Sequence, residues 1–143
     1  MCTKYSELAE ILDVTPIDIL GATAIVRIKV KGSELECFVP RFKVTSHFSV
    51  GEKCEVIISL LLYLNTLALS ERKKCIDNIT LTPIPTCLLS GEIIDIVSTS
   101  DPNTGKIIVD CGVIIDVDIA IKKYELHKGD YIKAKGRLDV YKC

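Results

Sequence analysis

Apolar and charged side chains alternate between residues 23 and 39. Val26, Ile28 and Val30 are separated by basic residues, and this period of two is typical of a strand with one buried face. Gly32-Ser33 fits the two-residue loop of a type II′ turn, so the segment predicts a β-hairpin. The predicted register places Lys31 opposite Glu34, Lys29 opposite Glu36 and Arg27 opposite Phe38.

The second half of the chain has the same kind of pattern. Residues 88–97, 106–110 and 113–121 predict three strands, separated by a turn at 101–105 and by Cys111-Gly112. A fourth strand follows Gly129, and Gly136 is expected to bend it. We therefore expect a mainly β protein.

Residues 51–63 and 129–141 share a pattern, 78 positions apart. Each starts with glycine and an acid and continues into a strand. The last residue of each is Tyr, and a Leu lies within the three residues before it. We interpret this as an internal repeat, and chance similarity of two β segments is the alternative. The run at 56–62 is almost wholly apolar, which predicts burial on both faces. A helix through 60–69 is a second reading, because a short apolar run does not settle the period.

The first residues predict a short helix. Apolar side chains at 5, 8, 9, 11 and 12 have helical spacing, Thr3 can cap the segment, and Pro16 ends it. Such a helix either plugs one end of a barrel or binds a partner. Pro83 and Pro85 mark a linker, which predicts one module over residues 1–82 and a second over residues 83–143.

The order of strand, hairpin, strand, connector and glycine-acid strand resembles the oligonucleotide/oligosaccharide-binding (OB) fold. The resemblance implies two small OB-like β-barrel modules, preceded by the short helix. The chain ends without a clear fifth strand for the second module, unless Gly136 divides the last segment into two. The two halves could instead complete one another.

The composition excludes few functions. The formal net charge is −1 and hydrophobic residues make up 48% of the chain, which is ordinary for a globular protein. Seven cysteines and no secretory signal pattern predict reduced thiols and a cytoplasmic location. The longest apolar run, 56–64, is far shorter than the roughly 20 residues of a membrane-spanning helix.

Motifs of catalysis and cofactor binding are absent from the sequence. There is no Gly-x-Ser-x-Gly, no phosphate-binding glycine loop and no Cys-x-x-Cys pair. Asp101 and Asn103 resemble the start of a calcium loop, but the twelfth position is Gly112, where a glutamate is required. We therefore expect a protein that is not an enzyme and has no metal or cofactor. A small-molecule enzyme using His47 or His127 is the least favoured alternative.

Charge is segregated along the chain. Residues 22–53 hold six Lys or Arg against three Glu, residues 122–143 hold seven against three acids, and residues 88–121 hold one against six. Aromatic side chains lie within both basic stretches, and aromatic stacking beside cationic grooves is how OB folds hold single strands. The predicted nucleic-acid-binding residues are Arg41, Phe42, Lys43, Tyr131, Lys133, Lys135 and Arg137.

Two functions follow as expectations. The first is a binding module for single-stranded DNA or RNA. The second is a protein-interaction or assembly module, including homo-oligomers, that uses sheet edges, the N-terminal helix or the acidic face. A solvated strand face with core phenylalanines explains the same residues without any ligand.

Overall fold

The computed structural model describes residues 4–17, 23–40, 48–79, 84–120 and 124–143. These residues form ten strands in one continuous sheet and contain no helix. The strands are β1 (Glu7–Pro16), β2 (Ala24–Val30), β3 (Ser33–Val39), β4 (Lys53–Leu62), β5 (Ala68–Leu69), β6 (Cys75–Ile79), β7 (Thr86–Ser98), β8 (Thr104–Asp110), β9 (Ile114–Ala120) and β10 (Tyr131–Lys142).

The predicted N-terminal helix is wrong, because its residues belong to β1. Glu7, Ala9 and Ile11 are buried, whereas Leu8 between the first two is exposed, which is the alternation of a strand. β1 pairs with β2 on one side and with β4 on the other, so its backbone groups find partners that an isolated short helix lacks. The proposed cap, Thr3, lies outside the described residues.

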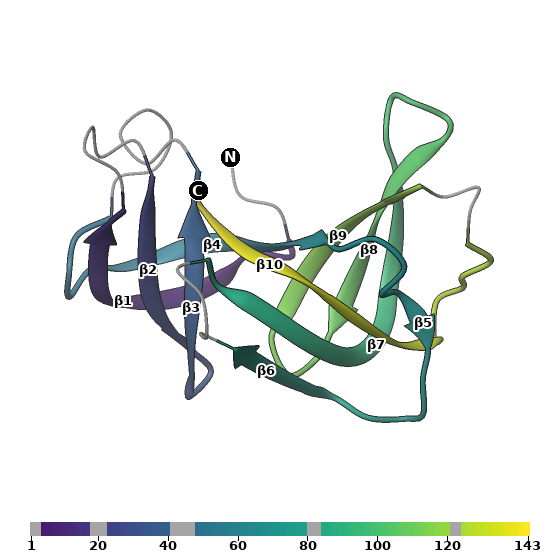
Figure 1. The fold of residues 1–143 in the computed structure, drawn as a ribbon, viewed down its shortest axis with the longest axis horizontal. Coiled ribbons are helices and arrows are strands. Elements are labelled where there is room, and N and C mark those ends of the chain that lie inside the picture. The colour runs from purple at the N-terminus through teal and green to yellow at the C-terminus, as the bar shows by residue number, and fades with distance from the viewer. Residues whose placement is uncertain (1–3, 18–22, 41–47, 80–83, 121–123) are drawn as a thin grey trace.

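The prediction of two separate barrels is also wrong, because β4 and β10 are shared. One ring of pairings runs β1-β2-β3-β10-β4 and back to β1. A second runs β7-β8-β9-β4-β10 and back to β7. Figure 1 shows β1–β3 at one end of the molecule, β7–β9 at the other, and β4 and β10 running between them. We call these ends the N-lobe and the C-lobe. The predicted boundary falls within residues 80–83, outside the described residues.

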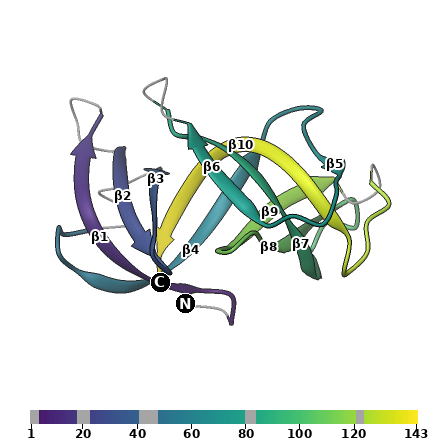
Figure 2. The same ribbon diagram turned by 90° about the horizontal axis from the view of Figure 1, so that it is seen from below.

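β4 and β10 cross in opposite directions at the centre. Leu60 pairs with Leu138, and each is nine residues beyond the glycine that precedes its strand. Figure 2 shows the two strands running diagonally from one lobe to the other. Gly136 allows the crossing, because a Cβ there would lie 2.2 Å from the Leu61 carbonyl oxygen.

The first hairpin forms, but its predicted turn and register are wrong. Lys31 and Gly32 both have positive φ, 50° and 83°, which identifies a type I′ turn one residue earlier than expected. As a result Lys29 lies opposite Glu34 and Arg27 lies opposite Glu36. The charged side chains still share one face, because the new register shifts β3 by two residues and side chains two residues apart lie on the same face of a strand.

The core runs through both lobes. Its largest buried side chains include Ile28 in the N-lobe, Leu60 and Leu138 at the crossing, and Ile115 in the C-lobe. Glu7 is buried as well, and its carboxylate lies 3.3 Å from the Lys31 ammonium. The described residues include no helix with the length and hydropathy that crossing a bilayer would need.

The cysteines only partly follow the expectation of reduced thiols. Five of those in the described residues are free thiols, and burial raises the pKa of the Cys111 thiol to about 11. Cys143 differs, because it is disulfide-bonded.

Candidate functional site

The outer face of β10 carries four of the seven residues predicted to bind nucleic acid. Ile132 and Ala134 are buried, so the alternate residues project from the opposite face of the strand. These are Tyr131, Lys133, Lys135 and Arg137, and we call them the β10 row. The other three predicted residues, Arg41, Phe42 and Lys43, lie outside the described residues. The structure therefore leaves open whether the two predicted groups form one surface.

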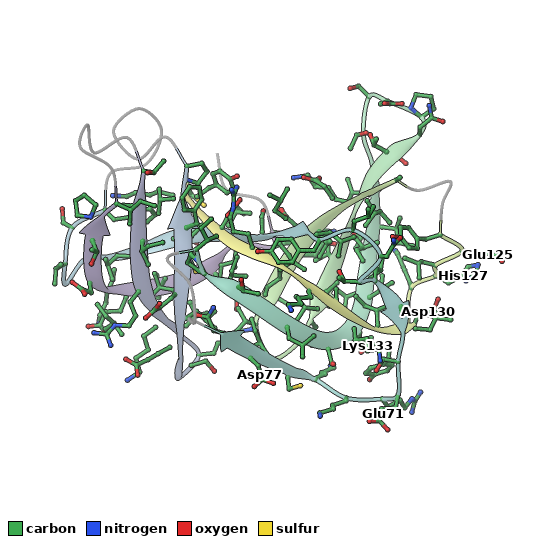
Figure 3. All side chains as sticks on the ribbon, viewed as in Figure 1. Glu71, Asp77, Glu125, His127, Asp130 and Lys133 are labelled. Carbon is green, nitrogen blue, oxygen red and sulfur yellow. The ribbon has the colours of Figure 1, made fainter. Side chains whose placement is uncertain are left out.

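Lys133 and Lys135 are the exposed middle of the β10 row. β7 places Ser90 beside Lys133 and Leu88 beside Lys135, and neither neighbour is charged. Within the described part of the chain, neither ammonium forms an ion pair. In Figure 3, Lys133 and Glu71 lie in the C-lobe half of the molecule, and Asp77 projects from β6 at the lower edge near the middle. These two lysines are the members of the row without an ion pair among the described residues. Asp77 of β6 lies on the same face, one strand beyond Leu88.

Tyr131 begins the row and is half-buried. The Arg72 guanidinium lies 5.7 Å from the centre of the Tyr131 ring, within range of a cation–π contact. Arg72 comes from the segment between β5 and β6, and the sequence alone gave no reason to place it here. It adds a positive charge next to Tyr131 and covers part of its ring.

Arg137 ends the row and is held by its own strand. Its guanidinium donates two hydrogen bonds to the Asp139 carboxylate, at 2.7 and 2.8 Å, and lies 4.3 Å from the centre of the Phe38 ring. Asp139 is only 4% exposed, and burial raises the pKa of its carboxyl while the Arg137 hydrogen bonds lower it. Arg137 therefore clamps β10 against β3, and its charge is largely neutralised.

The outer face of β7–β9 carries the opposite charge. Asp95, Asp116 and Asp118 lie on it, and Lys106 is 3.6 Å from Asp116 and 3.8 Å from Asp118. The Tyr5 hydroxyl donates to Asp95 and is the main reason why the pKa of that carboxyl is lowered. This face disfavours a polyanion, so the segregation of charge along the sequence is also a segregation between strands.

The connector before β10 shows what His127 does. Its backbone N–H donates to Asp130 at 2.8 Å, and its ring Nδ1 lies 3.7 Å from the same carboxylate. These contacts shape the turn into β10. Among the described residues, no group of three or more His, Cys, Asp or Glu side chains is arranged to hold a metal ion.

Neither the protein-family models nor the curated proteins contain a match to this chain. Function therefore has to be argued from the chemistry of the site itself. The described part of the predicted site is its β10 half, where Lys133 and Lys135 lie between an aromatic residue and a clamped arginine.

Proposed function

We propose that this protein is a non-enzymatic binding module that holds single-stranded nucleic acid along the outer face of β10. The observation that carries the proposal is the pair Lys133 and Lys135, exposed on one strand face without an ion-pair partner among the described residues. Proteins that bind single strands without sequence preference combine such a positive track with aromatic side chains. Tyr131 and Arg72 supply an aromatic ring and a guanidinium at one end of the track.

The two closed rings of strand pairings also support the resemblance to the OB fold. Each ring joins five strands, the number in an OB barrel, although the two rings share β4 and β10. We propose that the lobes are a strand-sharing variation on that fold and that they correspond to the two halves of an internal repeat. The cytoplasmic location and the reduced state of the free thiols belong to the same proposal.

Fluorescence anisotropy with labelled single-stranded DNA and RNA at low and high salt tests the proposal. Binding should be strongest at low salt, because phosphate contacts release counterions. The double variant Lys133→Glu and Lys135→Glu should abolish binding, and neutral variants at both positions should lower the log–log salt slope by about 1.4 for two lost contacts.

The matched control places two charge reversals in the N-lobe. Lys29→Glu and Lys53→Glu change the net charge by the same amount on exposed side chains away from the β10 row. The control should bind nearly as well as the natural chain at moderate salt. The proposal is wrong if micromolar protein binds no single strand in low salt, or if both double variants lose binding equally.

A protein-interaction or assembly module is the second candidate, and one observation favours it. Leu61, Leu64 and Leu69 are 51%, 82% and 63% exposed, and Leu64 borders a cavity of about 530 Å³ in the C-lobe. Exposed apolar side chains near a hollow suit a protein partner. The N-terminal helix no longer contributes, since it does not exist. A strict monomer that captures no protein would count against this function.

A further inference from the structure

A tyrosine from outside the predicted site reaches across β10. The Tyr63 backbone N–H donates a hydrogen bond of 2.9 Å to the Lys135 carbonyl oxygen. The Tyr63 hydroxyl oxygen lies 3.4 Å from the Thr86 hydroxyl oxygen. Thr86 belongs to β7, and β10 lies between β7 on one side and β4, with the chain that follows it, on the other. The Tyr63 side chain therefore spans β10.

The face that Tyr63 crosses is the one that carries the β10 row. Thr86 lies opposite Arg137 in the register of β7 and β10, and the side chains of such a pair share one face of the sheet. Cys87, the next residue of β7, is buried, so Thr86 points to the outer face. Tyr63 is half-buried. It therefore crosses the outer face between the levels of Lys135 and Arg137.

The lysines of the β10 row thus lie between two aromatic side chains. Tyr131 precedes Lys133 and Lys135 along the strand, and Tyr63 crosses just after them. Tyr131 and Lys135 are four residues apart, which is about 13 Å along a strand. Sites that bind single strands without sequence preference combine cationic groups for the phosphates with aromatic rings on which the bases stack. Two rings and two lysines on one face fit this arrangement.

The charges near Tyr63 differ between its two sides. Toward β10 its neighbours are Lys135 and Arg137, and Arg137 is already neutralised by Asp139. Toward β8 and β9, Tyr63 borders the C-lobe cavity of about 530 Å³, where Asp118 is the one charged side chain among the described residues of the lining. Lys135 is therefore the cation that can hold a phosphate beside the ring, and a bound strand should keep its phosphates away from Asp118.

We propose that Tyr63 is a base-stacking residue of this site, so that a single strand places phosphates on Lys133 and Lys135 and a base on the Tyr63 ring. The inference rests on the proposed function and adds to it a second aromatic contact besides Tyr131. The contact with Thr86 holds the ring across β10 before a ligand binds, which lowers the entropic cost of stacking.

Fluorescence anisotropy with a labelled oligothymidylate of about ten nucleotides tests the role of the ring. Tyr63→Leu should weaken binding about fivefold or more, because one stacked base loses its aromatic partner. The loss should be the same at low and high salt, with an unchanged log–log salt slope, because no phosphate contact is removed. Tyr63→Phe keeps the ring, so its affinity should lie within about twofold of that of the natural chain.

Tyr141→Leu is the matched control. Tyr63 lies twelve residues beyond Gly51 and Tyr141 lies twelve residues beyond Gly129, so the two are equivalent positions of similar segments. Tyr141 is 37% exposed on the outer face of β10, but it is six residues beyond Lys135, about 20 Å along the strand. The cavity of about 330 Å³ that it borders is lined by three carboxylates and two cations. The control should therefore bind as tightly as the natural chain.

A measurement on the natural chain does not depend on how the variants fold. In an NMR titration with the same oligothymidylate, the ring protons of Tyr63 should shift upfield, because a stacked base shields them. The ring protons of Tyr141 should stay in place. Unshifted Tyr63 ring protons at saturating oligonucleotide would overturn the inference.

The outcomes separate this inference from the proposed function. If the double variant Lys133→Glu and Lys135→Glu abolishes binding while folded Tyr63→Leu binds like the natural chain, the role of Tyr63 is wrong and the proposed function stands. A lower salt slope in Tyr63→Leu, or equal losses in Tyr63→Leu and Tyr141→Leu, would also overturn the role of Tyr63. If the natural chain binds no single strand in low salt, both proposals are wrong.

Discussion

β4 and β10 begin from the same kind of corner and end with different chemistry. Gly51 precedes β4 with φ of 87°, and Gly129 precedes β10 with φ of 93°. The outer face of β4 is largely apolar near the crossing, whereas the outer face of β10 carries charged side chains. The corner fixes where each strand begins, and the residues on the outer face of the strand are free to differ.

The hydrogen bonds of the two corners show how little sequence this frame needs. Each corner is closed by a pair of backbone bonds of 2.8 Å: Gly51 N to Ile11 O and Ile11 N to Glu52 O in one, Gly129 N to Ile93 O and Ile93 N to Asp130 O in the other. The acid in each corner also accepts a hydrogen bond from the backbone three residues earlier. A glycine and an acid therefore specify the corner, and the strand that follows can be buried or exposed.

Gly136→Val should have the largest effect on stability, because it blocks the crossing itself. A Cβ at this position would lie 2.2 Å from the Leu61 carbonyl oxygen, and backbone cannot move aside as a side chain can. We expect a loss of about 3 kcal/mol or more in the free energy of unfolding, measured by urea denaturation. Gly136 lies seven residues beyond Gly129. The equivalent position in β4, seven residues beyond Gly51, is Ile58, a large side chain that is buried there.

The control for this prediction is the neighbouring Lys135→Val. Lys135 is exposed on the outer face, so the same valine there should change stability by about 0.5 kcal/mol or less. Equal losses at positions 135 and 136 would show that the close approach of β10 to Leu61 does not limit the fold.

The strands of this fold could be predicted from sequence where the alternation is strict. In β2, Val26 and Ile28 alternate with Arg27, and the hairpin forms as the pattern indicates. In β1 the pattern is mixed, and a β-bulge between Ile11 and Asp13 shifts the register, so the apolar positions fit a helical period. The sharing of β4 and β10 depends on long-range pairing, and no local pattern reports it.

Only the part of the candidate site that depends on local alternation could be predicted from the sequence. Lys133 and Lys135 follow from the alternation of β10, which is a local property. The clamp on Arg137 does not, because it requires Phe38 from β3 and the burial of Asp139 at the junction of the lobes. The cavity of about 460 Å³ lined by Tyr5 and Ile58 was invisible in the sequence, since it lies where β1 ends its pairing with β4 before β9 begins.

Asp139→Ala should have the second largest effect on stability. It tests why equivalent positions of β4 and β10 differ in burial. Asp139 and Leu61 both lie ten residues beyond their corner glycine, yet Asp139 is 4% exposed and Leu61 is 51% exposed. Removing the carboxylate leaves the half-buried Arg137 without its partner, which should cost about 3 kcal/mol in the free energy of unfolding.

A second variant separates the charge from the packing. If the cost comes from the unpaired guanidinium, replacing both residues, with Arg137→Met and Asp139→Leu, should recover much of the loss in a double-mutant cycle. Additive losses in the double variant would mean that Asp139 and Arg137 act independently, contrary to the clamp. Leu61→Ala should cost far less than Asp139→Ala.

Gly51→Ala and Gly129→Ala should give smaller losses that are equal to each other. Both glycines have φ near 90°, and a Cβ at either position would meet no atom within 4 Å, so the cost is backbone strain alone. We expect about 1–2 kcal/mol for each, measured by thermal or urea denaturation. A difference between the two of more than about 1 kcal/mol would show that the corners are alike in geometry but not in energy.

Tyr5→Phe should have the smallest effect, and it tests a difference between Asp13 and Asp95. Each of these aspartates follows a β-bulge, between Ile11 and Asp13 in β1 and between Ile93 and Asp95 in β7. Asp13 and Asp95 each accept a hydrogen bond from the next backbone N–H, but only Asp95 also accepts one from the Tyr5 hydroxyl. That hydrogen bond is the main cause of the lowered pKa of Asp95, so the variant should raise this pKa toward its ordinary value.

The sign of the pH dependence follows from the lowered pKa. A carboxyl with a lower pKa in the folded chain contributes stability above the unfolded value of about 4, and this contribution is lost as the pH falls through the folded pKa. Tyr5→Phe should therefore be less stable than the natural chain at pH 7, with the difference shrinking at acid pH. Carboxyl ¹³C NMR titration measures the pKa directly, and Tyr131→Phe is the control that should leave it unchanged. An Asp95 pKa that is the same with Phe at position 5 would show that the backbone N–H and Lys128 hold this carboxylate without the tyrosine.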